Sequence, residues 1–404
     1  MTLTILFDLD DTLLIGSTEK ILPAYLSKFS AHLSQITDRP EKIVPAMMAA
    51  TELMLHNTDP TKTLKEVFDA DFYPAMGWDY QAPQALIEEF YSNHYPKLEQ
   101  MTSPNPAGLE LVKKLQARGD QIVIATNPIF PMIAVDQRLD WANLSAEKHA
   151  FSLVTNYEES HFTKPNPAYY TEILGKIGWP ENPMVMVGDN KAWDIDPAQE
   201  LGIATYWVDG DIGYTHEEAR APYHAGPLGG LLTWLDSIPE EQLIPDFSSP
   251  ISSTAIMRSI PAVLSSFLGD VSPADWHTPL SKDGWNLTEI ICHLRDVDRE
   301  IYIPRLNQVK ENERPFIEAI DADSWAEERN YKQQDGKQAF VDFTSARIKL
   351  LELINSFDSH SWQKEIRHTI FGPLSLAELL KISARHDKLH IQYIYEILTP
   401  LKRN

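Results

Sequence analysis

Short apolar runs recur in the first half of the chain and alternate with stretches in which apolar residues follow helical spacing. The runs are Thr4–Phe7, Gln121–Ala125, Phe151–Val154, Met184–Val187 and Ala204–Val208. A short, uninterrupted apolar run is typical of a strand that is buried on both faces, and strands separated by helices pair in parallel. The pattern therefore predicts an α/β fold with a doubly wound parallel sheet.

The segment between the first two runs has a different period. From about residue 19 to residue 98, apolar side chains recur three and four positions apart, as Tyr25 and Phe29 do. This spacing predicts helices and no strand. We therefore expect a helical insertion at about residues 15–101 of the α/β domain, which would span residues 1–236.

The pattern changes again after the last run. Residues 237–252 are rich in proline, acidic residues and serine and have no apolar period, which indicates a linker. Beyond it, four stretches at helical spacing predict a second, all-α domain, a four-helix bundle over residues 253–404. The stretches are Ala255–Leu268, Leu287–Lys310, Gly336–Phe357 and Leu376–Leu398. Two of them begin at capping-box sequences that start with Asn286 and Ser375.

The charge balance restricts the classes of partner. The chain has 404 residues and a formal net charge of -23. Nucleic acids and anionic membranes bind clustered Lys and Arg, which this chain lacks, so we expect neither as a partner. The single cysteine, Cys292, excludes an internal disulfide and favours a cytoplasmic location. No apolar run has the length and flanks of a signal peptide or a membrane span.

Polar residues follow four of the predicted strands. Asp8 and Asp10 follow the first, Thr126 the second, Lys164 lies in the loop after the third, and Asp189 and Asp194 follow the fourth. Each one alone has a simpler explanation as a helix cap, a turn residue or a solvated charge. Ligands bind at the carboxyl ends of parallel strands, so the whole set predicts one site. Its carboxylates suit a nucleophile, a general acid and Mg²⁺.

These motifs resemble those of a known family. Asp8-Leu9-Asp10-Asp11-Thr12, Thr126, Lys164-Pro165 and Gly188-Asp189-Asn190 with Asp194 resemble, in type, order and spacing, the four motifs of the haloacid dehalogenase (HAD) superfamily. The resemblance covers roughly residues 1–236. The helical insertion is similar to the small cap that closes over the substrate in this family.

The resemblance implies a role for each motif residue. Asp8 would be the nucleophile that forms an aspartyl phosphate, and Asp10 would be the general acid and base. Mg²⁺ would be held by Asp8, Asp189, Asp194 and a backbone carbonyl at Asp10, while Thr126 and Lys164 would bind the phosphoryl oxygens. Members that displace halide are expected to lack an acid at the position of Asp10, so the chain resembles the phosphatases of the family.

Three histidines lie on apolar stripes of the second domain. His386 and His390 are four residues apart in the last predicted helix, and His293 lies on the stripe of the second. A lone histidine on such a stripe is usually a packed core residue. Three imidazoles that face one another can instead bind Zn²⁺, Ni²⁺ or Fe²⁺ and leave coordination positions open. Cys292 lies about 100° around the helix from His293, so we expect it to pack in the core.

The second domain also resembles a family. The resemblance rests on three sequence stretches: Trp285-Asn286-Leu287-Thr288-Glu289-Ile290-Ile291-Cys292-His293-Leu294, Gly372-Pro373-Leu374-Ser375-Leu376 and His386-Asp387-Lys388-Leu389-His390. They are similar to motifs of the DinB-like four-helix bundles, over about residues 253–400. The resemblance implies a metal triad at His293, His386 and His390. Members of this family include thiol transferases, metal-dependent hydrolases and proteins of no known activity.

Three functions are compatible with this sequence. The leading hypothesis is a Mg²⁺-dependent phosphatase that hydrolyses a small phosphorylated metabolite in the first domain. The second makes the bundle the main enzyme, a metal-dependent transferase or hydrolase. In the third hypothesis, the bundle is only a binding or dimerisation module, and the protein would form a homodimer. The substrate itself depends on cap residues that no motif fixes.

Overall fold

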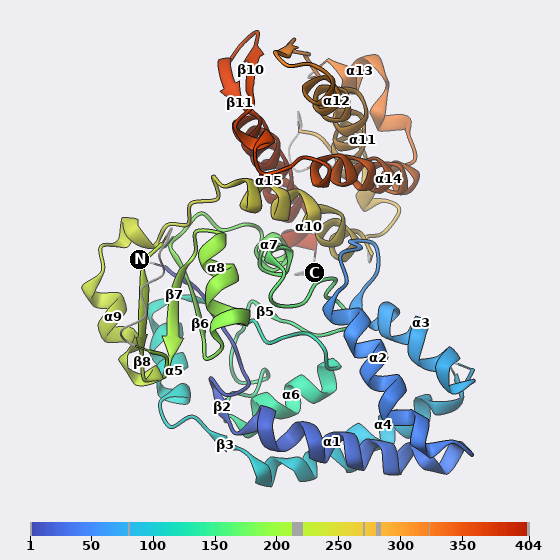
Figure 1. Ribbon diagram of the computed structural model, residues 1–404, viewed down its shortest axis with the longest axis vertical. Coiled ribbons are helices and arrows are strands. Elements are labelled where there is room, and N and C mark those ends of the chain that lie inside the picture. Colours follow the sequence, from blue (N-terminus) through green and yellow to red (C-terminus); the bar gives the residue numbers. More distant parts are fainter. Residues whose placement is uncertain are drawn as a thin grey trace. The chain divides into compact units, whose positions relative to one another are not determined.

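The computed structural model describes residues 2–79, 81–211, 221–269, 271–279, 284–322 and 324–401, so the predicted domain ends at residues 1 and 404 lie outside it. The chain folds as two compact units (Figure 1). The first comprises the chain up to Ile173 and Pro180–Asp246, and the second comprises Leu174–Trp179 and the chain from Phe247 onward. The passage from one unit to the next thus lies within the predicted linker. The short segment Leu174–Trp179, which we expected in the first domain, belongs to the second unit.

A six-stranded parallel sheet forms the first unit, as predicted. Its order is β5-β4-β1-β6-β7-β8. The strands are β1 (Thr4–Phe7), β4 (Gln121–Ile124), β5 (Leu153–Val154), β6 (Met184–Gly188), β7 (Ala204–Val208) and β8 (Tyr223–Gly226). Both β1 and β6 are buried along their whole length, which explains their continuous apolar runs. The edge strand β8 was not predicted, because its sequence Tyr-His-Ala-Gly has neither an apolar run nor alternation.

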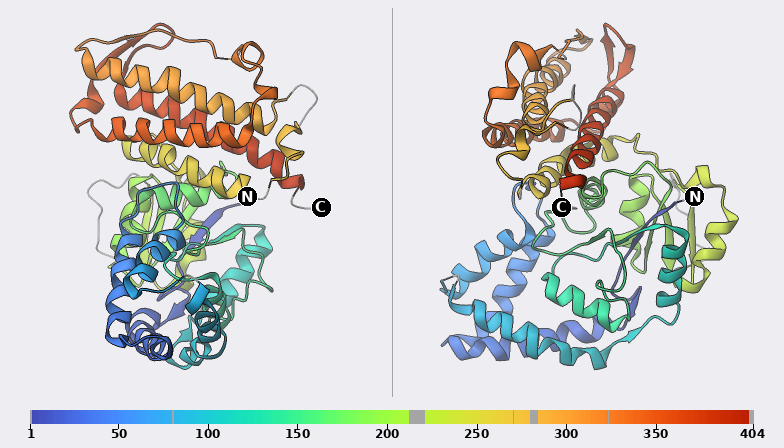
Figure 2. Two further views of the ribbon diagram at one scale, coloured as in Figure 1. Left: turned by 90° about the vertical axis from the view of Figure 1, so that its right-hand side faces the viewer. Right: turned by 180° about the vertical axis from the view of Figure 1, so that it is seen from behind.

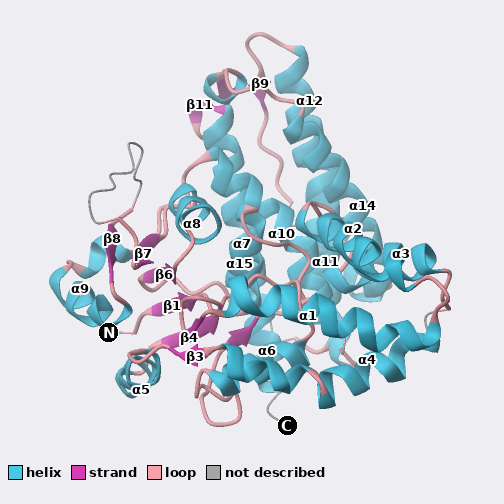
Figure 3. Cartoon of the chain, turned by 60° about the horizontal axis from the view of Figure 1, so that its bottom comes forward, coloured by secondary structure: helices cyan, strands magenta, loops and turns pink. Residues whose placement is uncertain are grey.

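Helices cover both faces of this sheet. They are α5 (Gly108–Arg118), α6 (Met132–Trp141), α7 (Pro167–Lys176), α8 (Asp196–Glu200) and α9 (Leu231–Ser237). Figure 3 shows α5 and α8 on opposite sides of the strands. Ile5 and Phe7 point to the same face of the sheet, where they share a buried core with Val112 of α5 and Leu139 of α6. Burial on both faces fixes the central strand and therefore the residues that follow it.

The helical insertion is confirmed. It contains α1 (Ser17–Leu33), α2 (Ile43–Leu55), α3 (Leu64–Met76), α4 (Gln81–Asn93) and a 3₁₀ segment, Tyr95–Met101. Figure 1 shows the four helices in blue, gathered beside the sheet. A two-stranded antiparallel ribbon of β2 (Leu14–Ile15) and β3 (Ser103–Pro104) joins this cap to the sheet domain. Tyr25, Phe29 and Phe90 form an aromatic core inside the cap.

The second unit contains the predicted four-helix bundle. Its long helices are α10 (Pro250–Leu268), α11 (Leu287–Val297) continued by α12 (Ile303–Glu311), α14 (Gly336–Asn355) and α15 (Leu376–Leu401). They run side by side in the left view of Figure 2, coloured from yellow to red. A π-helical turn, Asp298–Tyr302, joins α11 to α12. The capping box of Asn286 with Glu289 is present at the start of α11.

The bundle also carries elements that the sequence did not predict. A small sheet of β9 (Phe316–Ile317), β10 (Glu365–His368) and β11 (Gly372–Ser375), with the short helix α13 (Trp325–Glu328), decorates the all-α domain. Elements of two to four residues are too short to show a period.

One helix among the described residues, α10, is long and apolar enough to cross a bilayer by length and composition, with a mean hydropathy of 1.3. The sequence predicted most of this segment, Ala255–Leu268, as a helix of the bundle and not as a membrane span. Inside the protein, 72% of the segment is buried. The core helix of a bundle has the same composition, so this single helix is weak evidence for a membrane span.

Candidate functional sites

The register of the sheet brings the motif residues to one edge. Phe7 is level with Ile124 on β4 and with Val187 on β6. The residues that follow these positions therefore emerge together at the carboxyl ends of the three central strands. This edge is where parallel sheets bind ligands.

Asp8, Lys164 and Asp194 form a buried ionic cluster at this edge. The Lys164 Nζ atom lies 2.7 Å from Asp8 Oδ1 and 2.5 Å from Asp194 Oδ1. The lysine side chain is only 1% exposed. It is therefore not a solvated loop charge, which was the simpler explanation of its position in the sequence.

The loop that carries Lys164 is held from several sides. The Lys164 backbone N–H donates a hydrogen bond to Asn127 Oδ1 at 3.1 Å, which ties the loop to the turn after β4. Two residues earlier in the same loop, the buried Phe162 anchors the chain, and His161 Nδ1 lies 2.8 Å from Glu172 Oε1 of α7. Rigid support of this kind keeps the lysine beside Asp8.

The turn after β1 places both aspartates of the first motif. Asp11 adopts a left-handed conformation with φ 60°, which Asp tolerates better than most residues. Its carboxylate accepts a hydrogen bond from the Gly16 N–H at 2.7 Å and so closes the turn. Thr12 Oγ1 lies 3.4 Å from Asp189 Oδ1 and links this turn to the one after β6.

Asp8, Asp189 and Asp194 could hold a divalent cation. One carboxylate oxygen of each lies within 4.8 Å of the others. Burial, opposed by Lys164 but reinforced by the neighbouring carboxylates, raises the pKa of Asp8 well above its usual range. Burial and the charge of Asp194 raise the pKa of Asp189 to about 6. Oxygen ligands and excess negative charge fit Mg²⁺, which would stabilise the ionised carboxylates.

Asp10 lies apart from that carboxylate cluster. Its Oδ2 accepts a hydrogen bond from Nη1 of Arg138, a buried residue of α6. The predicted metal ligand at this position was the backbone carbonyl, so the Asp10 carboxylate is not needed to bind the metal. Arg138 was not predicted, although a signal existed: it lies among Ala134, Val135 and Leu139 on the buried face of its helix.

A cavity of about 230 Å³ opens onto these groups. Its polar lining includes Asp8, Asp10, Thr126, Asn127, Arg138, Lys164, Asp189, Asn190 and Asp194, and its other lining residues are Ile21, Leu22, Tyr95, Ile129, Phe130 and Trp193. Ile21 and Leu22 belong to the cap helix α1. The cap thus supplies part of the wall that a substrate would contact.

Thr126 lines this cavity and is buried. Its carbonyl accepts hydrogen bonds from Thr155 Oγ1 at 2.6 Å and from the Tyr169 hydroxyl at 2.8 Å. These two bonds fix the backbone of the turn after β4. All six residues predicted for the first site therefore line one cavity.

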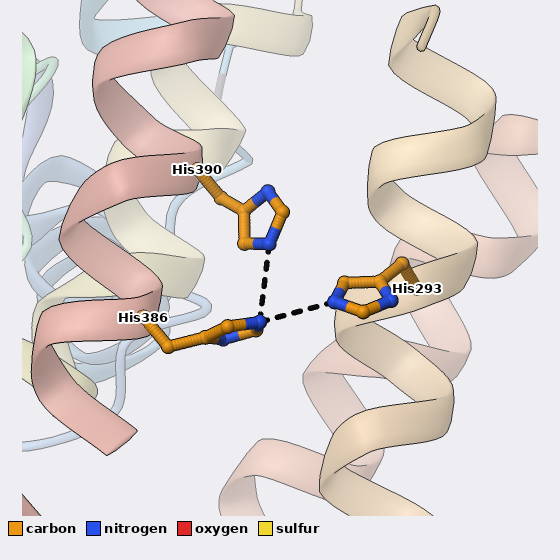
Figure 4. A group of neighbouring side chains, drawn as sticks. All are labelled: His293, His386 and His390. Carbon is orange, nitrogen blue, oxygen red and sulfur yellow. Dashed lines mark hydrogen bonds between the residues drawn. The ribbon is translucent and has the colours of Figure 1, made fainter. Parts of the chain in front are cut away.

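The three predicted histidines converge in the second unit. His293 of α11 and His386 and His390 of α15 point toward one another (Figure 4). The distance between the Nε2 atoms is 3.0 Å for His293 and His386, and 3.1 Å for His386 and His390. Trp285 stacks on the His390 ring, with centroids 6.3 Å apart.

The triad has the donor chemistry of a transition-metal site. Burial and the neighbouring His386 lower the pKa of His293 to about 3, and burial also lowers the pKa of His390 well below its usual range. Both rings are therefore neutral at pH 7, which is the form that binds metal. Three imidazole nitrogen donors fit Zn²⁺, Ni²⁺ or Fe²⁺ better than Mg²⁺.

Beside the triad, Arg347 of α14 joins all four long helices. It donates to Asp298 Oδ2 at 2.7 Å, to Asp387 Oδ2 at 2.5 Å and to the Met257 carbonyl at 3.0 Å. The three charged side chains are 0% exposed. Asp387 adjoins His386 in sequence, so this network also fixes the turn of α15 that carries the histidine.

Cys292 lies outside the triad. It is fully buried, and its Sγ atom lies 3.5 Å from Gln334 Oε1. Burial raises the pKa of its thiol to about 11, so the thiolate that would be needed for metal binding or catalysis is disfavoured. The structure therefore places Cys292 in the core, as the sequence predicted.

Comparison with known proteins identifies relatives of both units. Residues 5–208 match the haloacid dehalogenase-like hydrolase family, and residues 257–394 match the DinB superfamily. A protein of Oceanobacillus iheyensis that carries the name of a metal-dependent hydrolase is 24% identical over 143 residues, which are 34% of this chain and 79% of that protein. The two resemblances that the motifs predicted are thus confirmed.

Two solved structures resemble the first unit. An HAD phosphatase from Thermococcus onnurineus is 19% identical with a TM-score of 0.38, and the match covers 58% of this chain and 98% of the other. A 2-haloacid dehalogenase from Pseudomonas syringae pv. Tomato DC3000 is 22% identical with a TM-score of 0.41, and the match covers 58% of this chain and 99% of the other.

Proposed function

The chain belongs to the haloacid dehalogenase-like hydrolases, and from this premise we propose that its first unit is a Mg²⁺-dependent phosphatase of a small phosphorylated metabolite. The proposal rests on the position of the Asp10 carboxylate. Its carboxylate lines the same cavity as Asp8, and its Oδ1 atom has no hydrogen-bond partner among the described residues. An acid placed in this way can protonate the oxygen of a leaving alcohol, whereas displacement of a halide needs no proton.

In the proposed reaction, a carboxylate oxygen of Asp8 attacks phosphorus and the bond to the ester oxygen breaks. Asp10 gives its proton to that oxygen, and the alcohol leaves. Asp10 then takes a proton from the water that attacks the aspartyl phosphate, and phosphate leaves Asp8. Lys164 and Thr126 would bind the phosphoryl oxygens throughout. Mg²⁺, held by Asp8, Asp189 and Asp194, would offset the negative charge of the phosphate when bound.

Arg138 would position the general acid. Its guanidinium binds one oxygen of Asp10 and lies 4.7 Å from the centre of the Phe130 ring. The pair leaves the other oxygen of Asp10 without a partner among the described residues, so it is free to meet the leaving group. A panel of small phosphate esters, assayed for phosphate release with and without Mg²⁺, tests the proposed function. Release from no ester on the panel would reject it.

The proposed metal site should weaken in acid. The pKa of Asp189 is raised to about 6, so below pH 6 the folded protein holds this carboxylate protonated, and the proton competes with Mg²⁺. We expect the Mg²⁺ affinity to fall about tenfold from pH 7.5 to pH 5, with about half of the carboxylate already protonated at pH 6. Calorimetric titration of Mg²⁺ from pH 7.5 to pH 5 measures it, with the Asp189→Asn variant expected to bind weakly at every pH. A constant affinity in the wild-type protein would contradict the assignment.

We further propose that the bundle holds a transition metal at His293, His386 and His390, and that it is a second hydrolase or transferase centre. The convergence of three Nε2 atoms supports it. The Oceanobacillus iheyensis relative carries the name of a metal-dependent hydrolase, which is consistent with a hydrolase centre. A site with three protein ligands leaves coordination positions for water or substrate, as catalytic sites do.

Removal of one histidine ligand should strongly weaken metal binding. His293→Ala is expected to weaken Zn²⁺ or Ni²⁺ binding at least about 100-fold, because two remaining imidazoles cannot complete the site. Metal content after dialysis, measured by inductively coupled plasma mass spectrometry, reports the loss. The exposed His360, also in the second unit, provides the matched control variant His360→Ala. Equal metal content in wild type and His293→Ala would remove the basis of the proposal.

A further inference from the structure

The cavity of the first unit is lined by several residues whose buried polar atoms have no hydrogen-bond partner among the described residues. They are Asp10 Oδ1, Tyr95 OH, Asn127 Nδ2 and Arg138 Nη2. Buried polar groups in proteins are nearly always paired, so a set of unpaired atoms around one cavity indicates a bound ligand.

The proposed phosphatase reaction accounts for two of these atoms. Asp10 Oδ1 would meet the leaving oxygen. Asn127 lies next to Thr126 in the turn that would hold the phosphate, so its Nδ2 would donate to a phosphoryl oxygen. Tyr95 OH and Arg138 Nη2 have no role in that reaction.

Both remaining atoms are donors on buried side chains. Tyr95 is 0% exposed and Arg138 is 3% exposed. Burial, opposed by Arg138, raises the pKa of Tyr95 to about 12, so its hydroxyl keeps its proton. Arg138 is positively charged at any physiological pH. The two residues come from different elements, the 3₁₀ segment that ends the cap and helix α6.

The position of Arg138 defines where an acceptor would lie. Its Nη1 atom binds Asp10, and Asp10 in turn would contact the ester oxygen. We expect an acceptor bound by Nη2 to lie on the Asp10 side of the cavity, and therefore on the leaving group. Ile21, Leu22, Ile129 and Phe130 make the adjoining wall apolar, so they offer no acceptor to these donors.

We propose that Tyr95 and Arg138 form a leaving-group subsite that binds an oxygen acceptor, a hydroxyl or a carboxylate, near the ester bond of the substrate. This proposal rests on the proposed phosphatase function and narrows its substrate class. Phosphate esters of polyols or of hydroxy acids fit the subsite. Plain alkyl phosphates do not, because they would leave both donors unpaired.

Binding of phosphonates tests the subsite separately from catalysis, since a phosphonate cannot be hydrolysed at this bond. The probes are propylphosphonate, 3-hydroxypropylphosphonate and 3-phosphonopropionate, titrated by calorimetry into the full chain with Mg²⁺. They share a three-atom chain and differ in the terminal group. We expect the hydroxyl or the carboxylate compound to bind about tenfold more tightly than propylphosphonate.

The variant Tyr95→Phe removes one donor and should reduce this preference to about threefold or less. Tyr25→Phe is the matched control, because Tyr25 belongs to the same aromatic cluster but bonds to the Tyr91 hydroxyl at 2.9 Å. It should keep the preference. The tighter of the two oxygen-bearing probes identifies the acceptor as neutral or anionic.

Equal affinities of the three probes, or the absence of binding by all of them, would overturn the subsite. A preference that survives Tyr95→Phe would overturn it as well. A protein that prefers the oxygen-bearing probes but releases no phosphate from any ester would retain the subsite and lose the proposed phosphatase activity. The two proposals can therefore fail separately.

Discussion

Replacement of Asp8 by Asn is expected to lower phosphate release at least about 10⁴-fold while the protein stays folded. An amide at this position cannot attack phosphorus, so the covalent route is lost. Folding should not suffer, because burial disfavours the ionised Asp8 carboxylate and Lys164 keeps Asp194 as a partner. A neutral amide of the same shape also removes the repulsion between Asp8 and the neighbouring carboxylates. We therefore expect the free energy of unfolding to stay the same or to rise.

The measurement is phosphate release from the best substrate of the ester panel, together with a thermal unfolding curve for each variant. Asp196→Asn provides the control in the same unit, because Asp196 is paired with Lys191 and is outside the cavity lining. It should retain wild-type activity. Activity in Asp8→Asn within tenfold of the wild type would exclude Asp8 as the nucleophile.

The largest effect on stability is expected in the bundle. Arg347→Met should lower the free energy of unfolding of the second unit by about 3–5 kcal/mol, because it leaves Asp298 and Asp387 buried without their cation. Chemical denaturation followed by circular dichroism measures the loss. Arg385→Met is the matched control, since Arg385 is exposed on the same bundle, and it should change stability by less than about 1 kcal/mol.

Removal of the two carboxylates provides a second check of this network. When Asp298→Asn and Asp387→Asn are added to Arg347→Met, no unpaired charge remains in the core. We expect the triple variant to recover part of the lost stability, since neutral replacements of a buried ion network are often tolerated. A triple variant that is less stable than the wild type by the sum of the three separate losses would show that the three residues do not act as one network.

The sequence predicted those parts of the fold that depend on local pattern. The apolar runs of β1 and β6 are continuous because both strands are buried on two faces. The parallel register of the two strands then brings the motif residues that follow them to one edge of the sheet. The spacing of His386 and His390 likewise needs only the helical period. Strand β8 has no such pattern, because an edge strand with one neighbour need not be apolar.

The parts that the sequence did not predict depend on contacts between distant residues. Arg138 is 128 positions from Asp10, and nothing in its own helix shows that an acid lies opposite. Tyr95 is an ordinary buried aromatic residue in the sequence, and its unpaired hydroxyl is visible only in the folded cavity. A charged residue on an apolar helical face is the one local sign that could have indicated Arg138.

The fate of the attacking water tests the central proposal most directly. The protein is incubated with Mg²⁺ and its best ester in H₂¹⁸O for many turnovers, and both the released phosphate and the peptide that contains Asp8 are weighed by mass spectrometry. Attack at phosphorus, as we propose, places ¹⁸O in the phosphate and leaves Asp8 unlabelled. Incorporation of ¹⁸O into the Asp8 carboxylate would show that water attacks the side-chain carbon instead, as in displacement from a carbon ester, and would contradict the phosphatase assignment.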